Sequence, residues 1–598
     1  MIFIDTAINL IRRMINMFNK IKRICGLAIA LLMTLVMIVG CGGGADTGPT
    51  EQADQQQAET QQAPDDQGTP DLEPPEPVER DSGNILRFGT TSIDGRFNPI
   101  MANNIYDLYV TELIFDRLIS NDAEGNPTPW MATWEVSDDN LTYTFTLMEG
   151  ITFSDGVPLT SHDVAFTFST IAHPEYDGPR TYAVDKMLGF EAFNSGATDE
   201  FEAITIIDDH TISFTFADGE ASPANIWAFN YGIIPEHYYA FDNWGDFLDL
   251  LSDPLGSGRF VLDDYRPMEF LMLSARRNHW NPEWEPNIDG ILMTEVPQEL
   301  LIDAFATGTL DFAQPEALLD NYDEFTAMPG VSPLIFLGNG FTYMTFNTVR
   351  PQLEDVRVRQ ALMYALDRVP IIEAVYGPLG DLGLAPISPA SWAFPDEGIN
   401  DYALDLDLAR ELMAEAGWEP GADGILERDG ERMSLTWPVY TEVEWPARLA
   451  ELATDTWRQI GVELNIELTD FNSVIAQTMD PEPGEKDFDI YVLGFSLNID
   501  PDPSGAIFDY DAFVAGGFNA SGFFHEEAQN LITQGRTEFD QDVRTEIYKE
   551  WATLMNYYIP SVIIAYRNEL WIVGDNIDGM VMNSFQRWTF HAHEITIN

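Results

Sequence analysis

The chain has 598 residues, 45% of them hydrophobic, which is enough for two or more domains with ordinary buried cores. It carries 30 Lys and Arg against 98 Asp and Glu, a formal net charge of −68. It therefore lacks the clustered cations that nucleic acid or an anionic membrane surface requires, and we expect no nucleic-acid partner. Its two cysteines, Cys25 and Cys41, exclude a disulfide framework and a cysteine-rich zinc site.

The N-terminal segment has the order of a lipoprotein signal peptide. Five basic residues between Arg12 and Arg23 precede an apolar run, Leu27–Val39. This run is shorter than the roughly 20 residues that a membrane-spanning helix needs. It leads into Gly40-Cys41, and the junction resembles a bacterial lipobox. We expect residues 1–40 to be removed and Cys41 to carry lipid, which would anchor the protein at the outer face of the cell membrane; the alternative is a short membrane anchor with an incidental cysteine.

An acidic segment follows the lipobox. Residues 42–83 contain eleven acidic residues, one base and no aromatic residue. Such a composition cannot bury enough apolar surface to fold, so residues 41–83 are predicted to be a lipidated cysteine followed by a disordered tether. The sequence becomes globular from Asn84 onward.

Several later segments have the periodicity of regular secondary structure. Residues 142–147 alternate strictly between polar and apolar side chains, which predicts a half-buried strand. A second region predicts the order β-α-β-α-β, which favours a parallel sheet with covering helices and a ligand at the carboxyl ends of the strands. Its parts are a strand over 433–439, a helix from Pro446 that ends at Gly461, a strand over 462–468, a helix from about Phe471 and a strand over 488–495.

The common enzyme signatures are missing. The sequence has no G-x-S-x-G elbow, H-E-x-x-H pair, Walker A loop or G-x-G-x-x-G turn. Cysteine catalysis is excluded because Cys41 belongs to the lipobox. His591 and His593 could supply at most two metal ligands, and structural roles are favoured for them. We therefore predict no enzymatic activity, no metal site and no cofactor.

One segment has the character of a ligand site. Residues 494–503 leave a buried strand and enter a proline-punctuated acidic loop. The end of the strand could pair with the backbone of an extended peptide, and Asp500 or Asp502 could bind its ammonium group. The alternative is an acidic turn that caps the next element. The candidate ligand-binding residues are Gly494, Phe495, Ser496, Asn498, Asp500 and Asp502.

The segment Trp134–Val164, W-E-V-S-D-D-N-L-T-Y-T-F-T-L-M-E-G-I-T-F-S-D-G-V-P-L-T-S-H-D-V, closely resembles the signature of the family 5 extracellular solute-binding proteins. These are the peptide-, dipeptide- and nickel-binding receptors of ABC importers. Further landmarks of that family follow in order, so that the resemblance spans roughly residues 84–598. They are Gly256–Phe260 with Arg277–Trp280, Leu301–Phe312, Phe346-Asn347 with Val356–Arg368, and Gly417-Trp418 with Asp423–Gly430.

The resemblance implies an α/β protein with the two-lobe periplasmic-binding-protein-like fold, of type II. An extra subdomain belongs to the first lobe, and the lobes close on a ligand around a hinge. Lobe one would comprise residues 84–341 plus 567–598, with the subdomain at about 119–222, and lobe two residues 342–566; the hinge strands would lie near Phe341–Phe346 and Ile564–Arg567.

The resemblance also implies a function: a monomeric receptor that captures oligopeptides outside the cell and delivers them to the transmembrane subunits of an ABC permease. In peptide-binding relatives an aspartate after a G-W-x sequence pairs with the amino terminus of the peptide. Here the tryptophan is replaced by Phe495, direct alignment places Asn498 at the aspartate position, and Asp500 follows two residues later. A one-residue insertion relative to some relatives would make Asp500 the substitute for that aspartate, whereas Asn498 could accept a hydrogen bond without supplying charge. The alternatives are a receptor for a non-peptide solute (a metal chelate, an oligosaccharide or an opine-like compound) and a cell-surface enzyme or adhesin.

Overall fold

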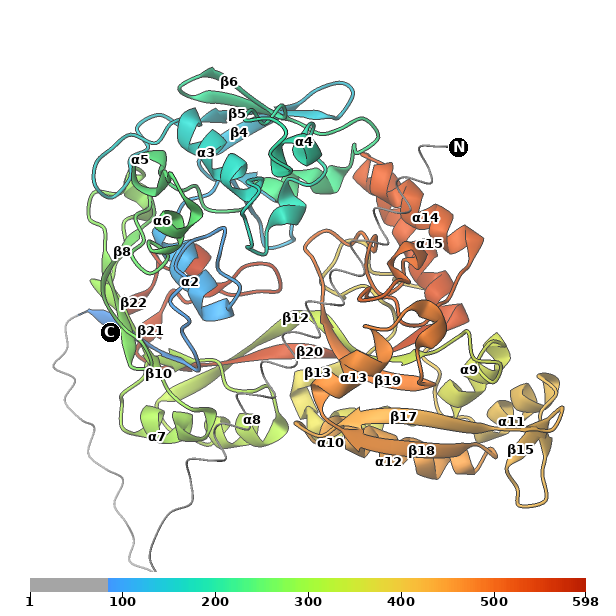
Figure 1. The fold of residues 1–598 in the computed structure, drawn as a ribbon. Helices are drawn as coiled ribbons and strands as arrows, with labels where there is room; N and C mark the ends of the chain where they lie inside the picture. Colours follow the sequence, from blue (N-terminus) through green and yellow to red (C-terminus); the bar gives the residue numbers. More distant parts are fainter. Residues whose placement is uncertain (1–83) are drawn as a thin grey trace, which may run out of the picture. The chain divides into compact units, whose positions relative to one another are not determined.

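The computed structural model describes residues 84–598, so the predicted signal peptide (1–40), Cys41 and the tether (41–83) lie outside the described part. Helices and strands follow one another along this whole length, as expected of an α/β protein (Figure 1). None of the described helices is both long enough and apolar enough to span a membrane.

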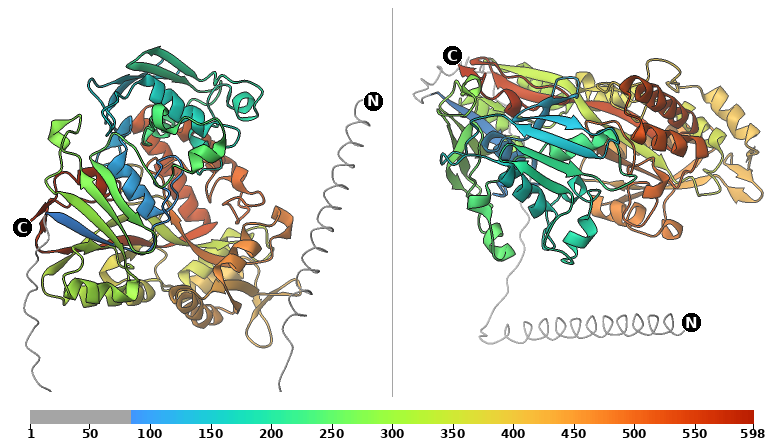
Figure 2. Two further views of the ribbon diagram at one scale, coloured as in Figure 1. Left: turned by 60° about the vertical axis from the view of Figure 1, so that its left-hand side comes forward. Right: turned by 90° about the horizontal axis from the view of Figure 1, so that it is seen from above.

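The described residues form a nine-stranded mixed sheet. Its order is β19-β12-β20-β11-β1-β10-β9-β8, and the ninth strand, β13, pairs with β20. The two longest strands, β12 and β20, are antiparallel and run from the part of the chain around β1 and β10 to the part around β19 (Figures 1 and 2). The strands are β1 (Ile85–Thr90), β8 (Phe260–Arg266), β9 (Phe270–Ala275), β10 (Gly290–Glu295), β11 (Phe312–Ala313), β12 (Val331–Phe346), β13 (Gly380–Leu382), β19 (Ile490–Ser496) and β20 (Ser561–Gly574).

A four-stranded antiparallel sheet, in the order β4-β5-β7-β6, lies within the predicted subdomain range. Its strand β5 is Thr142–Leu147, so the alternation in the sequence predicted this strand correctly. The neighbouring helix α3 (Ser161–Ile171) begins with a capping box, in which Thr160 and Asp163 satisfy each other's backbone N–H groups. The other strands are β4 (Ala132–Val136), β6 (Ile204–Asp208) and β7 (Thr211–Thr215).

The predicted β-α-β-α-β region is present, but its sheet differs from the prediction. β17 (Ser434–Tyr440) and β18 (Glu463–Thr469) pair in parallel, and α12 (Trp445–Arg458) and α13 (Phe471–Thr478) pack against the pair. The third strand, β19, does not extend this pair. It pairs antiparallel with β12, because the long strand β12 offers it an edge over seven residue pairs.

The remaining helices cover the sheets. Among them, α14 and α15 pack against each other, and α9 packs on α11. Short strand pairs and one small three-stranded sheet complete the described part. They are β2 (Ile119–Asn121) with β3 (Pro127–Pro129), β21 (Ile577–Asp578) with β22 (Thr596–Ile597), and β14 (Glu419–Pro420) with β15 (Leu426–Arg428) and β16 (Glu431–Arg432). The longer of these helices are α2 (Ile105–Ile114), α7 (Leu301–Ala306), α8 (Leu319–Thr326), α9 (Val356–Tyr364), α10 (Val369–Val375), α11 (Leu406–Glu415), α14 (Glu526–Thr537) and α15 (Gln541–Tyr558).

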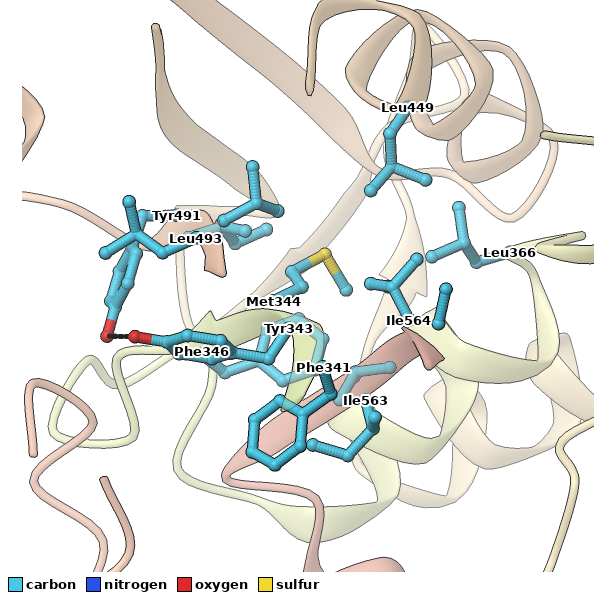
Figure 3. Close-up of a cluster of buried hydrophobic side chains, with 14 of the residues drawn as sticks. Phe341, Tyr343, Met344, Phe346, Leu366, Leu449, Tyr491, Leu493, Ile563 and Ile564 are labelled. Atoms are coloured by element: carbon cyan, nitrogen blue, oxygen red, sulfur yellow. Dashed lines mark hydrogen bonds between the residues drawn. The ribbon is translucent and has the colours of Figure 1, made fainter. Parts of the chain in front are cut away.

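Buried side chains fall into two hydrophobic clusters. One gathers residues from β1, α2 and the four-stranded sheet, and the other gathers residues from β12, β19 and the helices α9 to α15. In the second cluster, Tyr343 of β12 and Tyr491 of β19 bring their hydroxyl groups to 3.5 Å (Figure 3). Two cores give each part of the chain its own source of stability, and we keep the predicted lobe ranges as a proposal.

Candidate ligand-binding cleft

Three cavities adjoin Asn339, and together they are called the cleft here. The lobe-one cavity, of about 440 Å³, is lined by Arg117, Arg180 and Arg587 and by the turn after β19. The hinge cavity, of about 930 Å³, is lined by residues that include Tyr106, Trp445 and Arg567. The small loop cavity, of about 50 Å³, is lined by Asp502 and by apolar side chains of lobe two, among them Ile387, Phe508 and Trp551. The two larger cavities have the volume of typical small-molecule sites.

Glycines flank Asn339 on both sides because the backbone there leaves no room for a side chain. A Cβ on Gly338 would lie 2.6 Å from the carbonyl oxygen of Arg567, and a Cβ on Gly340 would lie 2.7 Å from that of Phe495. The register between β12 and β20 also shifts between Leu337 and Phe341. This irregularity positions Asn339 at the junction of the three cavities, where its Nδ2 donates to the carbonyl oxygens of Leu497 and Asn498 at 3.1 and 3.0 Å.

The three strand residues predicted for the site lie at the end of β19. Gly494, Phe495 and Ser496 pair with Thr342, Phe341 and Gly340 of β12. In the described sheet β19 is an edge strand, and β12 is the strand that pairs with it. Strand β17 contacts β19 on the other side, where the backbone N–H of Asp489, just before β19, donates to the carbonyl oxygen of Thr436. Gly494 and Ser496 are exposed, so the outer edge of β19 can accept an extended chain by strand addition.

Phe495 contributes to an apolar wall. Its ring stacks on Phe341 with centroids 6.0 Å apart, and Phe518 meets it edge-on at 5.9 Å. Phe341 and Phe495 line the loop cavity. Aromatic faces of this kind bury the side chain of a ligand without selecting a particular sequence.

Asp500 is already paired within the protein. Its two carboxylate oxygens accept hydrogen bonds from Nη1 and Nη2 of Arg544 at 2.6 and 2.7 Å, and both side chains are nearly buried. Burial lowers the pKa of Arg544, but the Asp500 carboxylate outweighs this effect and the net pKa is raised. Arg544 also donates to the carbonyl oxygen of Gly535. A ligand ammonium at Asp500 would therefore have to share a carboxylate whose charge is compensated.

Asp502 has a less saturated carboxylate. Its Oδ1 accepts from the backbone N–H and the hydroxyl of Ser504 at 3.0 and 2.7 Å, whereas Oδ2 accepts no hydrogen bond from the described residues. Burial raises the pKa of Asp502, and the neighbouring Asp500 charge adds to this effect. Asn498 is exposed and lines both the loop cavity and the lobe-one cavity, and its side-chain amide has no bond to the described residues.

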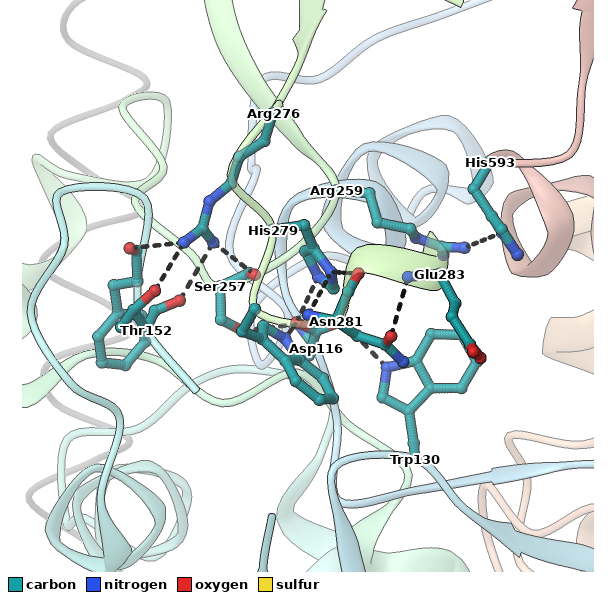
Figure 4. Close-up of polar contacts among 12 residues, drawn as sticks. Asp116, Trp130, Thr152, Ser257, Arg259, Arg276, His279, Asn281, Glu283 and His593 are labelled. Atoms are coloured by element: carbon teal, nitrogen blue, oxygen red, sulfur yellow. Dashed lines mark hydrogen bonds and ion pairs between the residues drawn. The ribbon is translucent and has the colours of Figure 1, made fainter. Parts of the chain in front are cut away.

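A buried polar network surrounds Asp116 (Figure 4), the residue that precedes Arg117 in the sequence. Asp116 accepts from the indole N–H groups of Trp130 and Trp280 at 3.0 and 2.7 Å, and Nε2 of His279 lies 3.4 Å from it. Burial alone would raise the pKa of Asp116, but these three groups lower it. The carboxylate is therefore ionised and fully engaged, and it helps to fix the backbone next to Arg117, which forms an isolated β-bridge with Gly232.

Contacts away from β12 and β20 join residues 84–341 to residues 342–566, the ranges predicted for the two lobes. Arg536 of α14 forms an ion pair with Glu220 at 3.2 Å, and the side-chain amide of Gln541 lies 3.5 Å from that of Asn126. Ile499 would meet a Cβ placed on Gly125 at 3.2 Å. Of these residues, Ile499 also lines the lobe-one cavity.

Sequence reasoning did not identify three residues of this region. Arg544 lies 44 residues after Asp500, so no local pattern joins them. Asn339 lies in an interruption of β12, and its flanking glycines were a visible signal. Arg117 follows Asp116 inside an apolar run, Leu113–Ile119, and two charges in a buried run were a signal as well.

Comparison with known proteins gives a consistent picture. Residues 126–513 match the family described as "Bacterial extracellular solute-binding proteins, family 5 Middle". The chain is 23% identical over 510 residues to the oligopeptide-binding protein AppA of Bacillus subtilis, covering 83% of this chain and 89% of the relative. It is 27% identical over 543 residues to heme-binding protein A of Haemophilus influenzae, covering 86% and 93%. The structure of B. subtilis AppA with a nonapeptide superimposes with a TM-score of 0.66 at 21% identity, covering 86% of this chain and 99% of that one.

The family match extends over more than half of the chain, so the protein belongs to the family 5 bacterial extracellular solute-binding proteins. The structural likeness confirms the predicted α/β, two-lobe fold of periplasmic binding proteins. The class of protein is therefore a receptor that binds a solute outside the cytoplasm.

Proposed function

We propose that this protein captures oligopeptides in the cleft and delivers them to an ABC permease. The observation that carries the proposal is the end of β19, where an open strand edge, an aromatic wall and the Oδ2 atom of Asp502 adjoin one cleft. An extended peptide needs these three features: backbone pairing, room for side chains and a counter-charge for its amine. The peptide-binding relative AppA supports the same ligand class.

For the amine contact we propose Asp502 as the principal partner, with Asn498 as a neutral acceptor beside it. Asp500 has a positioning role in this proposal, because its ion pair with Arg544 holds the loop that carries Asp502. Gly494, Phe495 and Ser496 supply the strand edge and the apolar wall. All six predicted residues thus belong to the proposed site, with Asp500 acting on the loop and not on the ligand.

Calorimetry with a peptide and its N-acetylated form tests this proposal. Acetylation should weaken binding by about 30-fold or more, because it removes the partner of a partly buried carboxylate. The Asp502→Asn variant should bind both forms with similar, weak affinity. If acetylation costs nothing in the wild type, the ligand is not held by its amine.

A non-peptide ligand is the second candidate, and the relation to heme-binding protein A is the observation that favours it. A haem or a metal chelate would carry carboxylates and no ammonium group. It would therefore be insensitive to Asp502→Asn, which separates the two candidates.

We also propose that the mature protein begins at a lipid-modified Cys41, is anchored to the outer face of the cell membrane and acts as a monomer. The lipobox-like junction and the acidic tether support this arrangement. Cys41→Ala should give unprocessed or released protein, measured by membrane fractionation and mass spectrometry of the N-terminal peptide. A wild-type protein that is cleaved well after Cys41 and carries no lipid would contradict the proposed anchoring.

A further inference from the structure

Arg117 differs from the other buried arginines of the described residues. Arg117 is 9% exposed. Its guanidinium has neither a hydrogen-bond acceptor nor an ion-pair partner among residues 84–598. The guanidinium lies over the rings of Phe590 and Trp130, at 4.1 and 5.3 Å from their centroids. Aromatic faces hold an arginine in place, but they leave its five N–H donors unsatisfied.

The other buried arginines all donate to carbonyl or carboxylate oxygens. Arg259 donates to the carbonyls of Thr589 and Phe590, and Arg368 donates to those of Gly383, Ile563 and Asp401. The same holds for Arg276, Arg359 and Arg544. An unpaired buried guanidinium is thus an exception among residues 84–598, and such a group is costly unless a ligand supplies a partner.

The nearby carboxylates are engaged elsewhere. Glu112 accepts from Arg587 and from the hydroxyl of Thr589, and Asp116 accepts from two indoles. Burial lowers the pKa of Arg117 to about 10, and the Glu112 charge only partly offsets this effect. Arg117 therefore remains charged at neutral pH, without a carboxylate in contact.

Arg117 also faces the cleft. It lines the lobe-one cavity together with Arg180, whose Nε is buried without a partner, and with Arg587. Glu112 also lines this cavity, but it is ion-paired with Arg587, so Arg117 and Arg180 leave the lining with an excess of positive charge. Such an excess is conspicuous in a chain whose residues after position 40 include 25 basic and 97 acidic ones. Such a cavity concentrates positive potential and attracts an anionic group.

We propose that Arg117 binds a carboxylate of the captured ligand. A guanidinium presents two parallel N–H donors to a carboxylate, which gives both energy and orientation. This proposal takes one assumption from the proposed function, namely that the ligand is a peptide. In that case the peptide lies with its amine near Asp502 and its carboxylate at Arg117, passing Asn498, which lines both cavities. The carboxylate is either the C-terminal group or an acidic side chain.

Calorimetry on the ligand-free protein tests the contact with three probes: trialanine, trialanine amide, and Ala-Glu-Ala amide. If the C-terminal group is bound, the amide of trialanine should bind about 30-fold more weakly or worse than the free acid. If an acidic side chain is accepted, Ala-Glu-Ala amide should regain the lost affinity. Arg117→Met, which retains apolar contact with Phe590, should bind all three probes with the same weak affinity.

Arg266→Met is the matched control, because Arg266 also lies over a phenylalanine ring, 4.9 Å from the centroid of Phe270, but on β8 and outside the cleft lining. It should leave all three affinities unchanged. Circular dichroism shows whether Arg117→Met is folded; if it is not, the comparison of free acid with amide in the wild type decides alone. Equal affinity of wild type for trialanine and both amides would overturn the inference and leave the peptide function standing.

A peptide-independent measurement separates the two proposals. The midpoint of thermal unfolding is compared in acetate and in chloride at equal ionic strength. Acetate should raise it in the wild type and in Arg266→Met, but not in Arg117→Met, by mass action on the native state. If acetate stabilises the protein in this Arg117-dependent way and no peptide binds, the carboxylate site at Arg117 is supported and the proposed peptide-binding function is contradicted. If neither the stabilisation by acetate nor the affinity for any peptide depends on Arg117, the proposed carboxylate site is contradicted.

Discussion

Arg544 and Arg117 are both buried, but only Arg544 has a carboxylate partner among the described residues. Arg544 donates to both oxygens of Asp500 and to a carbonyl oxygen, and it fixes a loop of the lobe-two wall. Arg117 lines the lobe-one cavity and lies over two aromatic rings, without an acceptor among the described residues. A charge that is compensated inside the protein stabilises the fold, whereas an uncompensated charge that faces a cavity is available to a ligand.

The largest expected effect concerns stability and would test this contrast directly. Arg544→Met leaves the Asp500 carboxylate buried without its partner, which should lower the free energy of unfolding by about 3–5 kcal/mol. Arg117→Met removes a charge that has no partner, and it should be neutral or stabilising, within about 1 kcal/mol. Urea unfolding of both variants measures the difference.

The double variant Asp500→Asn/Arg544→Met is the control for the first of these changes. It should recover most of the lost stability, because no uncompensated charge remains. An equal loss of stability in Arg544→Met and Arg117→Met would remove the distinction between a structural and a ligand-binding arginine.

The next effect, on affinity, concerns the pH dependence of the amine contact. Burial raises the pKa of Asp502 in the ligand-free protein, and an ammonium ligand binds only the ionised carboxylate. Peptide affinity should therefore rise as the pH increases through that raised pKa, and then level off. Asp502→Asn should remove this dependence and weaken binding by about 30-fold at neutral pH, measured by calorimetry over a pH series. An unchanged pH profile in the variant would assign the amine contact to another residue.

The smallest expected effect concerns the contact between the lobes. The Arg536–Glu220 ion pair is about one-third exposed on each side, so solvent screens it. Arg536→Gln should change peptide affinity by less than about fivefold, which corresponds to at most about 1 kcal/mol. The salt dependence of the affinity should become slightly weaker. A loss comparable to that of Asp502→Asn would show that this pair controls closure.

Local patterns in the sequence predicted much of the fold. Alternation located β5 without error, and the helical spacing that ends at Gly461 located α12 to within a few residues. The position of β19 was also close, but its pairing with β12 was not predicted. That pairing joins residues about 150 positions apart, and periodicity carries no information on such contacts.

The site was predictable to a similar extent. The end of β19 and the acidic loop after it line the cleft, as predicted. Both could be located from the sequence because they belong to, or directly follow, one recognisable strand. The different states of Asp500 and Asp502 depend on Arg544, which comes from a helix far along the chain. The role proposed for Arg117 depends on the absence of a partner in the described structure, which no sequence pattern displays.

The most direct measurement is a native mass spectrum of the protein as purified from its own host, followed by release and fragmentation of any bound molecule. We expect one or more retained peptides, each with an unblocked amine and at least one carboxylate, and we expect them to be lost from the doubly substituted Asp502→Asn/Arg117→Met variant. A single non-peptide mass, such as a haem or a metal chelate, retained equally by the wild type and this variant, would contradict it.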